Sequence, residues 1–267
     1  MTMRPTLPAL LLAVAVTAVP TLGAVATATP PGRSAAAVVP ASASAAAQQD
    51  AVVSKRKLGE SVNGHPIMAY RLGERGQPTV VLISTMHGNE PHTRRILESL
   101  RDGRTIRGID LWVIPTYNPD GLARGTRRNA RGVDLNRNFP HKWADLDGNY
   151  ESGRHPASEP ETRAVMAFLE EIDPFRVVSF HQPLNGVDTD TKEPRFARRL
   201  ARALRLPLTS LDCGGLCHGT MTMWFNHHFR GAALTVEYPA HPSRRRMVSA
   251  APRQLLGALG AHRTSRG

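Results

Sequence analysis

Two histidines and two glutamates of this sequence are placed as the parts of a hydrolytic metal centre would be. His87 and Glu90 directly follow one apolar run. His181 and Glu237 end two other runs. Two imidazoles and one carboxylate form a three-ligand zinc set that leaves one position open for water. Since a separate carboxylate beside that water can serve as general base, these residue types predict a catalytic zinc ion.

The apolar runs before these residues are typical of buried strands. Residues 79–86 and 109–115 are almost continuously apolar, as expected where helices cover both faces of a sheet. Residues 175–181 and 232–238 end in the polar residues named above. Helices are expected at residues 91–101, 158–172, 194–204, 220–229 and 252–262. Strands that alternate with helices predict an α/β sandwich with a mostly parallel sheet, in which ligands bind beyond the carboxyl ends of the strands.

A long polar segment lies between the second and third of these strands. Residues 116–157 are rich in Asn, Gly, Arg, Asp and Pro and predict long loops, which in a compact domain are usually functional. Two local signals are also present. Asn63-Gly64 indicates a hairpin turn, and Ser158 with Glu161 would form a capping box at a helix start.

Five short segments give the chain a resemblance to a known family. They are HGNE at 87–90, NPDG at 118–121, GVDLNRNFP at 132–140, SFHQP at 179–183 and TVEYP at 235–239. The chain resembles the zinc metallocarboxypeptidase family, in which these segments occur in the same order. Its HQPL and GTMTMW segments resemble the bacterial murein peptide amidase A branch. The resemblance implies a three-layer α/β sandwich with a mixed, mostly parallel sheet of roughly eight strands flanked by helices.

The resemblance also implies roles for the residues at the strand ends. His87, Glu90 and His181 match the ligands of one zinc ion. Glu237 matches the catalytic base that takes a proton from the attacking water. Asp134 is expected to support the site, as a hydrogen-bond partner of a histidine ligand or of a loop amide.

Residues of the long loop would bind the substrate. By the resemblance, Arg127 polarises the scissile carbonyl and stabilises the oxyanion, and Arg128 is the competing choice. Asn136 and Arg137 match the pair that binds the terminal carboxylate, for which a guanidinium offers a suitable planar fork. Met221 lies about where the family reads the side chain that follows the scissile bond.

Composition limits the partners and the covalent links. The 267 residues include 34 Lys+Arg against 22 Asp+Glu, and the formal net charge of +12 favours acidic partners in general. No nucleic-acid motif accompanies this charge, so nucleic acid is not expected. Cys213 and Cys217 are too few for a disulfide framework. In an exported protein they are expected to form one disulfide, which would stiffen a wall of the substrate site.

The first fifty residues are not expected to belong to the folded domain. Residues 1–28 have a positive start, an apolar stretch and small residues at a cleavage site, as signal peptides do. Residues 29–50 are rich in Ala, Ser and Pro and predict a linker or pro-segment. Residues 51–267 would form the catalytic domain. We expect a secreted, extracellular or wall-associated monomer, periplasmic if the host has an outer membrane, with no stable membrane anchor.

Together these features predict a secreted zinc-dependent metallocarboxypeptidase or amidase. It would hydrolyse a C-terminal peptide or γ-glutamyl amide bond in a peptide with a free terminal carboxylate, with peptidoglycan-derived peptides as one such substrate. Two alternatives stay open. One is a zinc-dependent N-acyl amino acid deacylase of the aspartoacylase type, and activity on N-acyl amino acids but not on peptides would favour it. The other is a wall-binding pseudoenzyme, and zinc content followed by hydrolysis assays would test it.

Overall fold

A computed structural model of the chain describes residues 51–211 and 213–265. The expected signal peptide and linker fall in residues 1–50, which lie outside the described residues, as do Asp212 and residues 266–267. No helix within the described ranges is both long enough and apolar enough to span a bilayer.

The middle layer is a mixed sheet of eight strands. These are β1 (Val52–Glu60), β2 (Pro66–Gly73), β3 (Thr79–Ser84), β5 (Asp110–Ile114), β6 (Arg176–His181), β7 (Leu184–Asp188), β8 (Leu208–Thr209) and β9 (Ala232–Pro239). Their order in space is β1-β2-β5-β3-β6-β9-β7-β8. Pairing is parallel from β5 through β3 and β6 to β9, and again between β7 and β8. The other neighbours are antiparallel. Two short strands, β4 (Ile106–Arg107) and β10 (His262–Arg263), form a separate pair.

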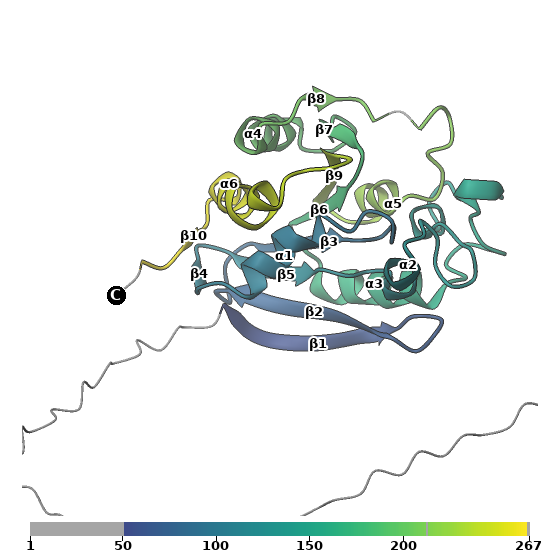
Figure 1. Ribbon diagram of the computed structural model, residues 1–267, viewed down its shortest axis with the longest axis horizontal. Helices are drawn as coiled ribbons and strands as arrows, with labels where there is room; N and C mark the ends of the chain where they lie inside the picture. The colour runs from purple at the N-terminus through teal and green to yellow at the C-terminus, as the bar shows by residue number, and fades with distance from the viewer. Residues whose placement is uncertain (1–50, 212, 266–267) are drawn as a thin grey trace, which may run out of the picture. The chain divides into compact units, whose positions relative to one another are not determined.

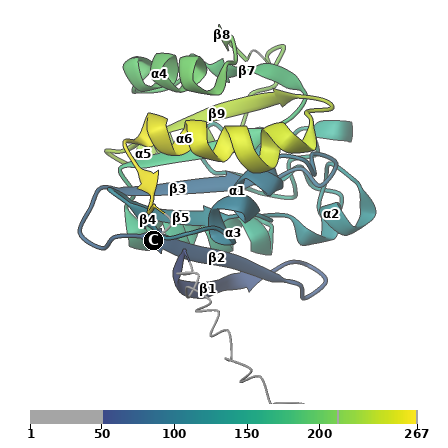
Figure 2. The same ribbon diagram turned by 60° about the vertical axis from the view of Figure 1, so that its left-hand side comes forward.

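Helices cover both faces of this sheet. They are α1 (Arg94–Arg101), α2 (Pro119–Arg124), α3 (Pro160–Ile172), α4 (Pro194–Leu204), α5 (Met221–His228) and α6 (Ala251–Leu259). Helices α1, α4 and α6 lie on one face, and α3 and α5 lie on the other (Figures 1 and 2). The structure therefore confirms the expected three-layer α/β sandwich.

The apolar run of β3 shows why the sheet is buried on both sides. Successive side chains of a strand point to opposite faces. Val80 and Leu82 belong to the apolar cluster that contains α1, α4 and α6. Val81 and Ile83 belong to the cluster that contains α3 and α5. A strand covered on both faces must be apolar at every position, as this one is.

The loop expected at residues 116–157 contains a helix that the sequence reasoning missed. The Asn118 side chain accepts a hydrogen bond from the Gly121 amide (2.8 Å), and Pro119 occupies the first turn of α2. Gly125 ends the helix in the left-handed region, at a φ of 64°. These are ordinary helix start and stop signals. Because α2 is so short, it offers no recognisable apolar period.

Two local expectations had different outcomes. The hairpin between β1 and β2 is present, with Gly64 in the left-handed region at a φ of 81°. The capping box is absent. Ser158 Oγ donates to Glu159 Oε1 (2.8 Å), and the Glu161 side chain accepts from the Val62 amide (3.1 Å). Helix α3 begins at Pro160, and both side chains of the expected capping box have other partners, one next to it in the chain and one on the β1–β2 turn.

Candidate active site

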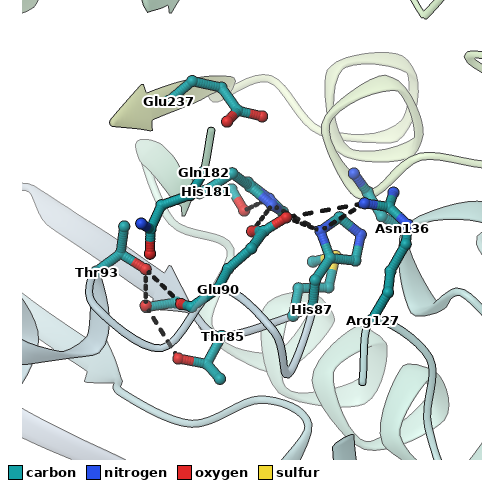
Figure 3. Close-up of polar contacts among 12 residues, drawn as sticks. Thr85, His87, Glu90, Thr93, Arg127, Asn136, His181, Gln182 and Glu237 are labelled. Carbon is teal, nitrogen blue, oxygen red and sulfur yellow. Dashed lines mark hydrogen bonds and ion pairs between the residues drawn. The ribbon is translucent and has the colours of Figure 1, made fainter. Parts of the chain in front are cut away.

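Three buried side chains meet beyond the carboxyl ends of β3 and β6. His87 Nδ1 lies 2.6 Å from Glu90 Oε1 and 3.2 Å from His181 Nδ1. Glu90 Oε2 lies 3.0 Å from His181 Nδ1. One candidate ligand atom from each side chain lies within 4.8 Å of the others, and Figure 3 shows the three groups converging. The structure therefore brings together the three side chains that were predicted to bind zinc, here called the triad.

Local backbone features position the triad. His181 is the last residue of β6 and is adjacent in register to Glu237 of β9. His87 follows β3 and is succeeded by Gly88, which packs against α2. A Cβ atom added at Gly88 would lie 1.9 Å from the backbone carbonyl carbon of Gly121. Only glycine permits this approach, so the residue after His87 sets how closely α2 packs against the site.

The second nitrogen of each histidine ring forms a hydrogen bond with a further side chain. His87 Nε2 lies 3.0 Å from Asp134 Oδ1, and His181 Nε2 lies 2.8 Å from Ser179 Oγ. These contacts fix both rings with Nδ1 turned toward Glu90. Asp134 thus has the supporting role that was expected of it.

The donor set and the charges of the triad fit a divalent cation. Burial lowers the pKa of His87, but the carboxylates of Glu90 and Asp134 outweigh it and raise this pKa to about 9. Burial raises the pKa of Glu90, but the two histidines of the triad outweigh it and lower this pKa to about 2. His87 Nδ1 and His181 Nδ1 lie 3.2 Å apart, and both also lie within 3.0 Å of a Glu90 carboxylate oxygen. Two nitrogens and a carboxylate are a donor set that suits zinc, so these residues fit one zinc ion.

Glu237 lies beside the triad, and among the described residues no hydrogen bond joins its carboxylate to a triad side chain. It is 8% exposed, and its Oε2 accepts a hydrogen bond from the Leu184 amide (3.1 Å). Figure 3 shows its carboxylate at the end of β9, facing the space next to the triad. Burial raises the pKa of Glu237 above its usual range, His181 opposes the shift and Glu90 adds to it. A carboxylate with a raised pKa at this place is suited to general-base catalysis.

Arg127 reaches the triad and Arg128 does not. Arg127 donates to Asp134 Oδ2 through Nε (2.9 Å) and Nη2 (2.8 Å), and its Nη1 lies 3.3 Å from His87 Nδ1. Asp134 therefore orients a histidine and an arginine at once. Arg128 Nη1 donates to the Gly148 carbonyl (2.7 Å). Of the two arginines, only Arg127 therefore lies at the triad.

Arg137 is a buried cation with a free donor. It is 3% exposed, and its Nη1 donates to the Asn136 carbonyl (2.7 Å). Within the described part of the chain, its Nε has no hydrogen-bond partner. Burial lowers the pKa of Arg137, and the carboxylate of Asp134 opposes this shift. Because Arg137 lines a cleft, its guanidinium is suited to bind a ligand carboxylate.

One cleft of about 610 Å³ contains these groups. The predicted residues that line it are His87, Glu90, Arg127, Asn136, Arg137, His181, Cys213, Cys217 and Glu237. The two cysteines form a disulfide in the wall of this cleft, as expected.

Met221 is a correction to the sequence prediction. Its side chain is fully buried in the apolar cluster on the α3 and α5 face, and it does not line the cleft. Only its amide serves the site, by donating to Asn136 Oδ1 (3.0 Å). Because a helix turns by about 100° per residue, its neighbours Thr222 and Met223 line the cleft instead.

Tyr150 is a site residue that the sequence reasoning missed. Its ring centroid lies 5.4 Å from Arg127 Cζ and 4.9 Å from Arg137 Cζ, and the residue lines the cleft. The ring thus contacts both cations of the site. No signal in the loop sequence distinguishes this tyrosine.

Two polar residues that support the site could have been found. Asn118 Nδ2 donates to the carbonyls of Met86 (3.2 Å) and Arg127 (3.4 Å), so it ties the end of β3 to the arginine. Its place in the NPDG segment was the available signal. Ser179 stands two residues before His181 in the same strand, and such residues share a face.

Comparison with known proteins gives consistent matches. A family model described as zinc carboxypeptidase matches residues 41–183. Murein peptide amidase A of Escherichia coli strain K12 is 31% identical over 198 residues, which cover 68% of this chain and 79% of that protein. The crystal structure of murein-tripeptide amidase MpaA from Escherichia coli O157 matches with a TM-score of 0.65 and 27% identity, over 79% of this chain and 93% of that one. Carboxypeptidase A from Helicoverpa armigera shares the fold, with a TM-score of 0.64 at 18% identity, over 78% of this chain and 68% of that one.

Proposed function

This chain belongs to the zinc carboxypeptidase family of peptide hydrolases, and we propose that it cleaves the last amide bond of a peptide that has a free terminal carboxylate. The bond is a C-terminal peptide bond or a γ-glutamyl amide, and peptidoglycan-derived peptides are the proposed source. One observation carries the proposal: the triad, Arg127, Arg137 and Glu237 all line a single cleft. The similarity to murein peptide amidases supports the choice of peptide.

The triad would hold one zinc ion through His87 Nδ1, His181 Nδ1 and the Glu90 carboxylate. When bound, zinc supplies Lewis-acid polarisation of the scissile carbonyl and lowers the pKa of a water molecule. Asp134 and Ser179 keep the two rings in the orientation that this binding needs.

Glu237 and Arg127 would perform the proton and charge transfers. Glu237 would take a proton from the attacking water and deliver it to the leaving nitrogen, so one side chain would carry out both proton transfers. Arg127 donates to the carbonyl oxygen as negative charge develops there. Its contact with Asp134 fixes the guanidinium before the substrate arrives, and a donor held in place in a water-poor cleft stabilises the transition state strongly.

Asn136 and Arg137 would bind the terminal carboxylate. The Arg137 guanidinium, which lines the cleft, would donate to one carboxylate oxygen. The side-chain oxygen of Asn136 accepts a hydrogen bond from the Met221 amide, so the side-chain NH₂ group of Asn136 would be left for the ligand. This pairing would place the scissile bond, one residue back from the carboxylate, near the triad.

Export and assembly remain proposals that rest on sequence features. Residues 1–28 would direct secretion, to the extracellular space or cell wall or to the periplasm of a host with an outer membrane. Residues 29–50 would link this signal to the catalytic domain, and the enzyme would act as a monomer. A disulfide at Cys213 and Cys217 is consistent with an oxidising compartment.

The Glu237→Gln variant tests the mechanism, because glutamine keeps the shape of the side chain and cannot accept the proton. We expect wild-type zinc content and a fall in kcat of about 10²- to 10⁴-fold on peptides with a free C-terminus. Arg128→Lys is the control and should keep turnover within a fewfold. Unchanged turnover in Glu237→Gln would contradict the mechanism. Hydrolysis of N-acyl amino acids but not of peptides would instead indicate a deacylase, and zinc-loaded protein inactive on both would indicate a pseudoenzyme.

A further inference from the structure

The acidic and basic residues of this chain are unevenly distributed. Residues 194–267 contain 12 of the 34 Lys+Arg but only two of the 22 Asp+Glu, Asp212 and Glu237. A general preference for arginine would raise the number of cations throughout the chain, and it would not remove the anions from one part of it. A charge asymmetry of this kind indicates an interaction with an acidic partner.

Helix α4 concentrates this charge on its exposed side. The helix and the residue that follows it carry five arginines, all of them exposed: Arg195, Arg198, Arg199, Arg202 and Arg205. At about 100° per residue these five lie within an arc of about 120°, and they extend over about 15 Å of the helix axis. The opposite side of α4, which includes Phe196 and Leu200, packs into the apolar core. We call these five residues the arginine face.

The arginine face has no acidic partner. Helix α4 contains neither Asp nor Glu, and none of the five arginines forms an ion pair within residues 51–211 and 213–265. On α1, by contrast, Arg94 pairs with Glu98 one turn later. Like charges three and four residues apart destabilise a helix, and several such pairs follow one another on α4. The arginine face therefore lowers the stability of the helix, and an anionic partner would offset that loss.

A hollow at the start of α4 extends the arginine face. Its volume is about 400 Å³. The described residues that line it include one carboxylate, that of Glu193, and four cations, those of Arg176, Lys192, Arg195 and Arg199. Arg176 Nε donates to Glu193 Oε2 (2.7 Å), so this carboxylate is already neutralised. An anionic group that enters the hollow would meet the other three cations without competition from a carboxylate.

The surroundings of the arginine face add positive charge and leave the catalytic cleft free. Helices α4 and α6 lie side by side and are in contact (Figures 1 and 2). Residues 240–265, which include α6, contain no Asp or Glu, and Arg244, Arg245 and Arg253 among them are exposed. No residue of α4 or α6 lines the cleft. A long anion on this side of the molecule would therefore not block the substrate site.

We propose that the arginine face is a docking surface for a linear polymer of the cell envelope that carries phosphodiester groups. Guanidinium groups pair well with phosphate oxygens, and side chains three or four apart on a helix are about 5–6 Å from each other at Cβ. A flexible chain with repeated charges therefore meets several arginines at once. The choice of an envelope polymer rests on the proposed function and export. Docking would hold the enzyme where peptidoglycan-derived peptides are released.

The exposed side chains of α4 favour such a polymer over a bilayer or a nucleic acid. A helix that binds at a bilayer surface inserts apolar side chains among the lipids. The apolar side chains of α4 are buried in the core instead, and its exposed residues are Pro194 and arginines. The expected export would separate the enzyme from nucleic acid.

The test measures binding of the zinc-loaded protein to poly(glycerol phosphate) at about 0.15 M salt. One variant replaces four residues of the arginine face by glutamine: Arg195→Gln, Arg198→Gln, Arg199→Gln and Arg202→Gln. We expect it to bind at least about 30-fold more weakly than the wild type. The slope of log Kd against log salt concentration should fall by about 3, since each lost phosphate contact lowers it by about 0.7.

A matched control removes the same number of exposed cations outside α4: Lys55→Gln, Arg75→Gln, Arg124→Gln and Arg154→Gln. At this salt concentration, charges more than about 8 Å from the polymer are screened, so the control should bind within about threefold of the wild type. Both variants should hydrolyse soluble peptides at the wild-type rate, which shows that they are folded. If the wild type hydrolyses no peptide, the proposed function fails, and thermal unfolding replaces hydrolysis as the test of folding while the binding assay still decides this inference.

Three outcomes would overturn the inference and leave the proposed function intact. Equal losses in the two fourfold variants would mean that net charge alone attracts the polymer. A wild type that does not bind poly(glycerol phosphate) would exclude the partner. Tighter binding to duplex DNA, or to vesicles of phosphatidylglycerol and phosphatidylcholine, than to the polymer would assign the arginine face to a nucleic acid or to a bilayer.

Discussion

Two clusters of this chain combine imidazole and carboxylate groups and have different uses. In one, the Asp120 carboxylate accepts from Ser61 Oγ (2.8 Å) and the Asn63 amide (3.0 Å) and contacts His65 Nδ1 (2.7 Å). The imidazole of this cluster, that of His65, is half-exposed. In the other, the triad, all three side chains are buried and both imidazoles turn the same nitrogen toward a shared point.

The two clusters differ in whether donors from the protein satisfy every carboxylate oxygen. Each oxygen of Asp120 faces a donor, so the cluster is satisfied and pins the β1–β2 turn to α2. The triad combines two imidazole nitrogens with a carboxylate around one point, a donor set that suits zinc. A histidine and a carboxylate therefore indicate a scaffold or a metal site according to what lies around them. Three variants, ordered by their expected effect on zinc, test this contrast.

Removal of a triad ligand should have the largest effect. His181→Asn keeps a polar side chain but loses the imidazole Nδ1, so we expect zinc content to fall from about one ion per chain to near zero. Zinc at 1,000 times its Kd should stabilise the wild type by about 4 kcal/mol, and the variant not at all. Metal analysis and thermal unfolding with and without chelator measure both. One equivalent of tightly bound zinc in the variant would exclude His181 as a ligand.

Removal of the residue that orients a ligand should have an intermediate effect. Asp134→Asn weakens the contact that fixes the His87 ring, so zinc affinity should fall about 10- to 100-fold with the stoichiometry unchanged. Competition with a chromogenic chelator gives the affinity. Ser179→Ala, which removes the hydroxyl beside His181, is the matched comparison on the other ring. An unaltered affinity in Asp134→Asn would show that packing alone fixes His87.

The Asp120 cluster should have no effect on zinc. Asp120→Asn should keep zinc affinity within about twofold, and it should lower the free energy of unfolding by about 2 kcal/mol at pH 7, because a buried charged acceptor is lost. Burial raises the pKa of Asp120, but bonds from His65 and Ser61 and from the Asn63 amide outweigh it and lower the pKa below its usual range. The carboxylate therefore stabilises the fold above the usual pKa of about 3.9, and this stability is lost as pH falls through the lower, folded-state pKa.

Urea unfolding of both proteins, stripped of metal, tests that pH dependence. The gap in unfolding free energy between wild type and Asp120→Asn should narrow as the pH is lowered below about 4. A gap that stays constant with pH would mean that shape, and not charge, stabilises this cluster. Lost zinc binding in the variant would mean that the two clusters are not independent.

Much of the site followed from short segments of sequence, because each places its residues at a strand end. His87, Glu90 and His181 need only the order and parallel direction of β3 and β6 to come together. Asp188, which also lines the cleft, shows the limit of such reasoning. Its strand β7 is short and carries no apolar run, so neither the strand nor its pairing with β9 was expected from the sequence.

The chain order of its motifs by itself indicated the family, the α/β layering and the residues of the candidate metal centre, because strand ends and ligand types are local properties. Only the tertiary structure decided which face of α5 meets the cleft, so that Met221 is core and Thr222 is lining. It also decided that the disulfide loop packs against Asp188 through Leu211. Helix rotation and contacts between distant segments depend on how layers pack, and packing is a property of the whole fold.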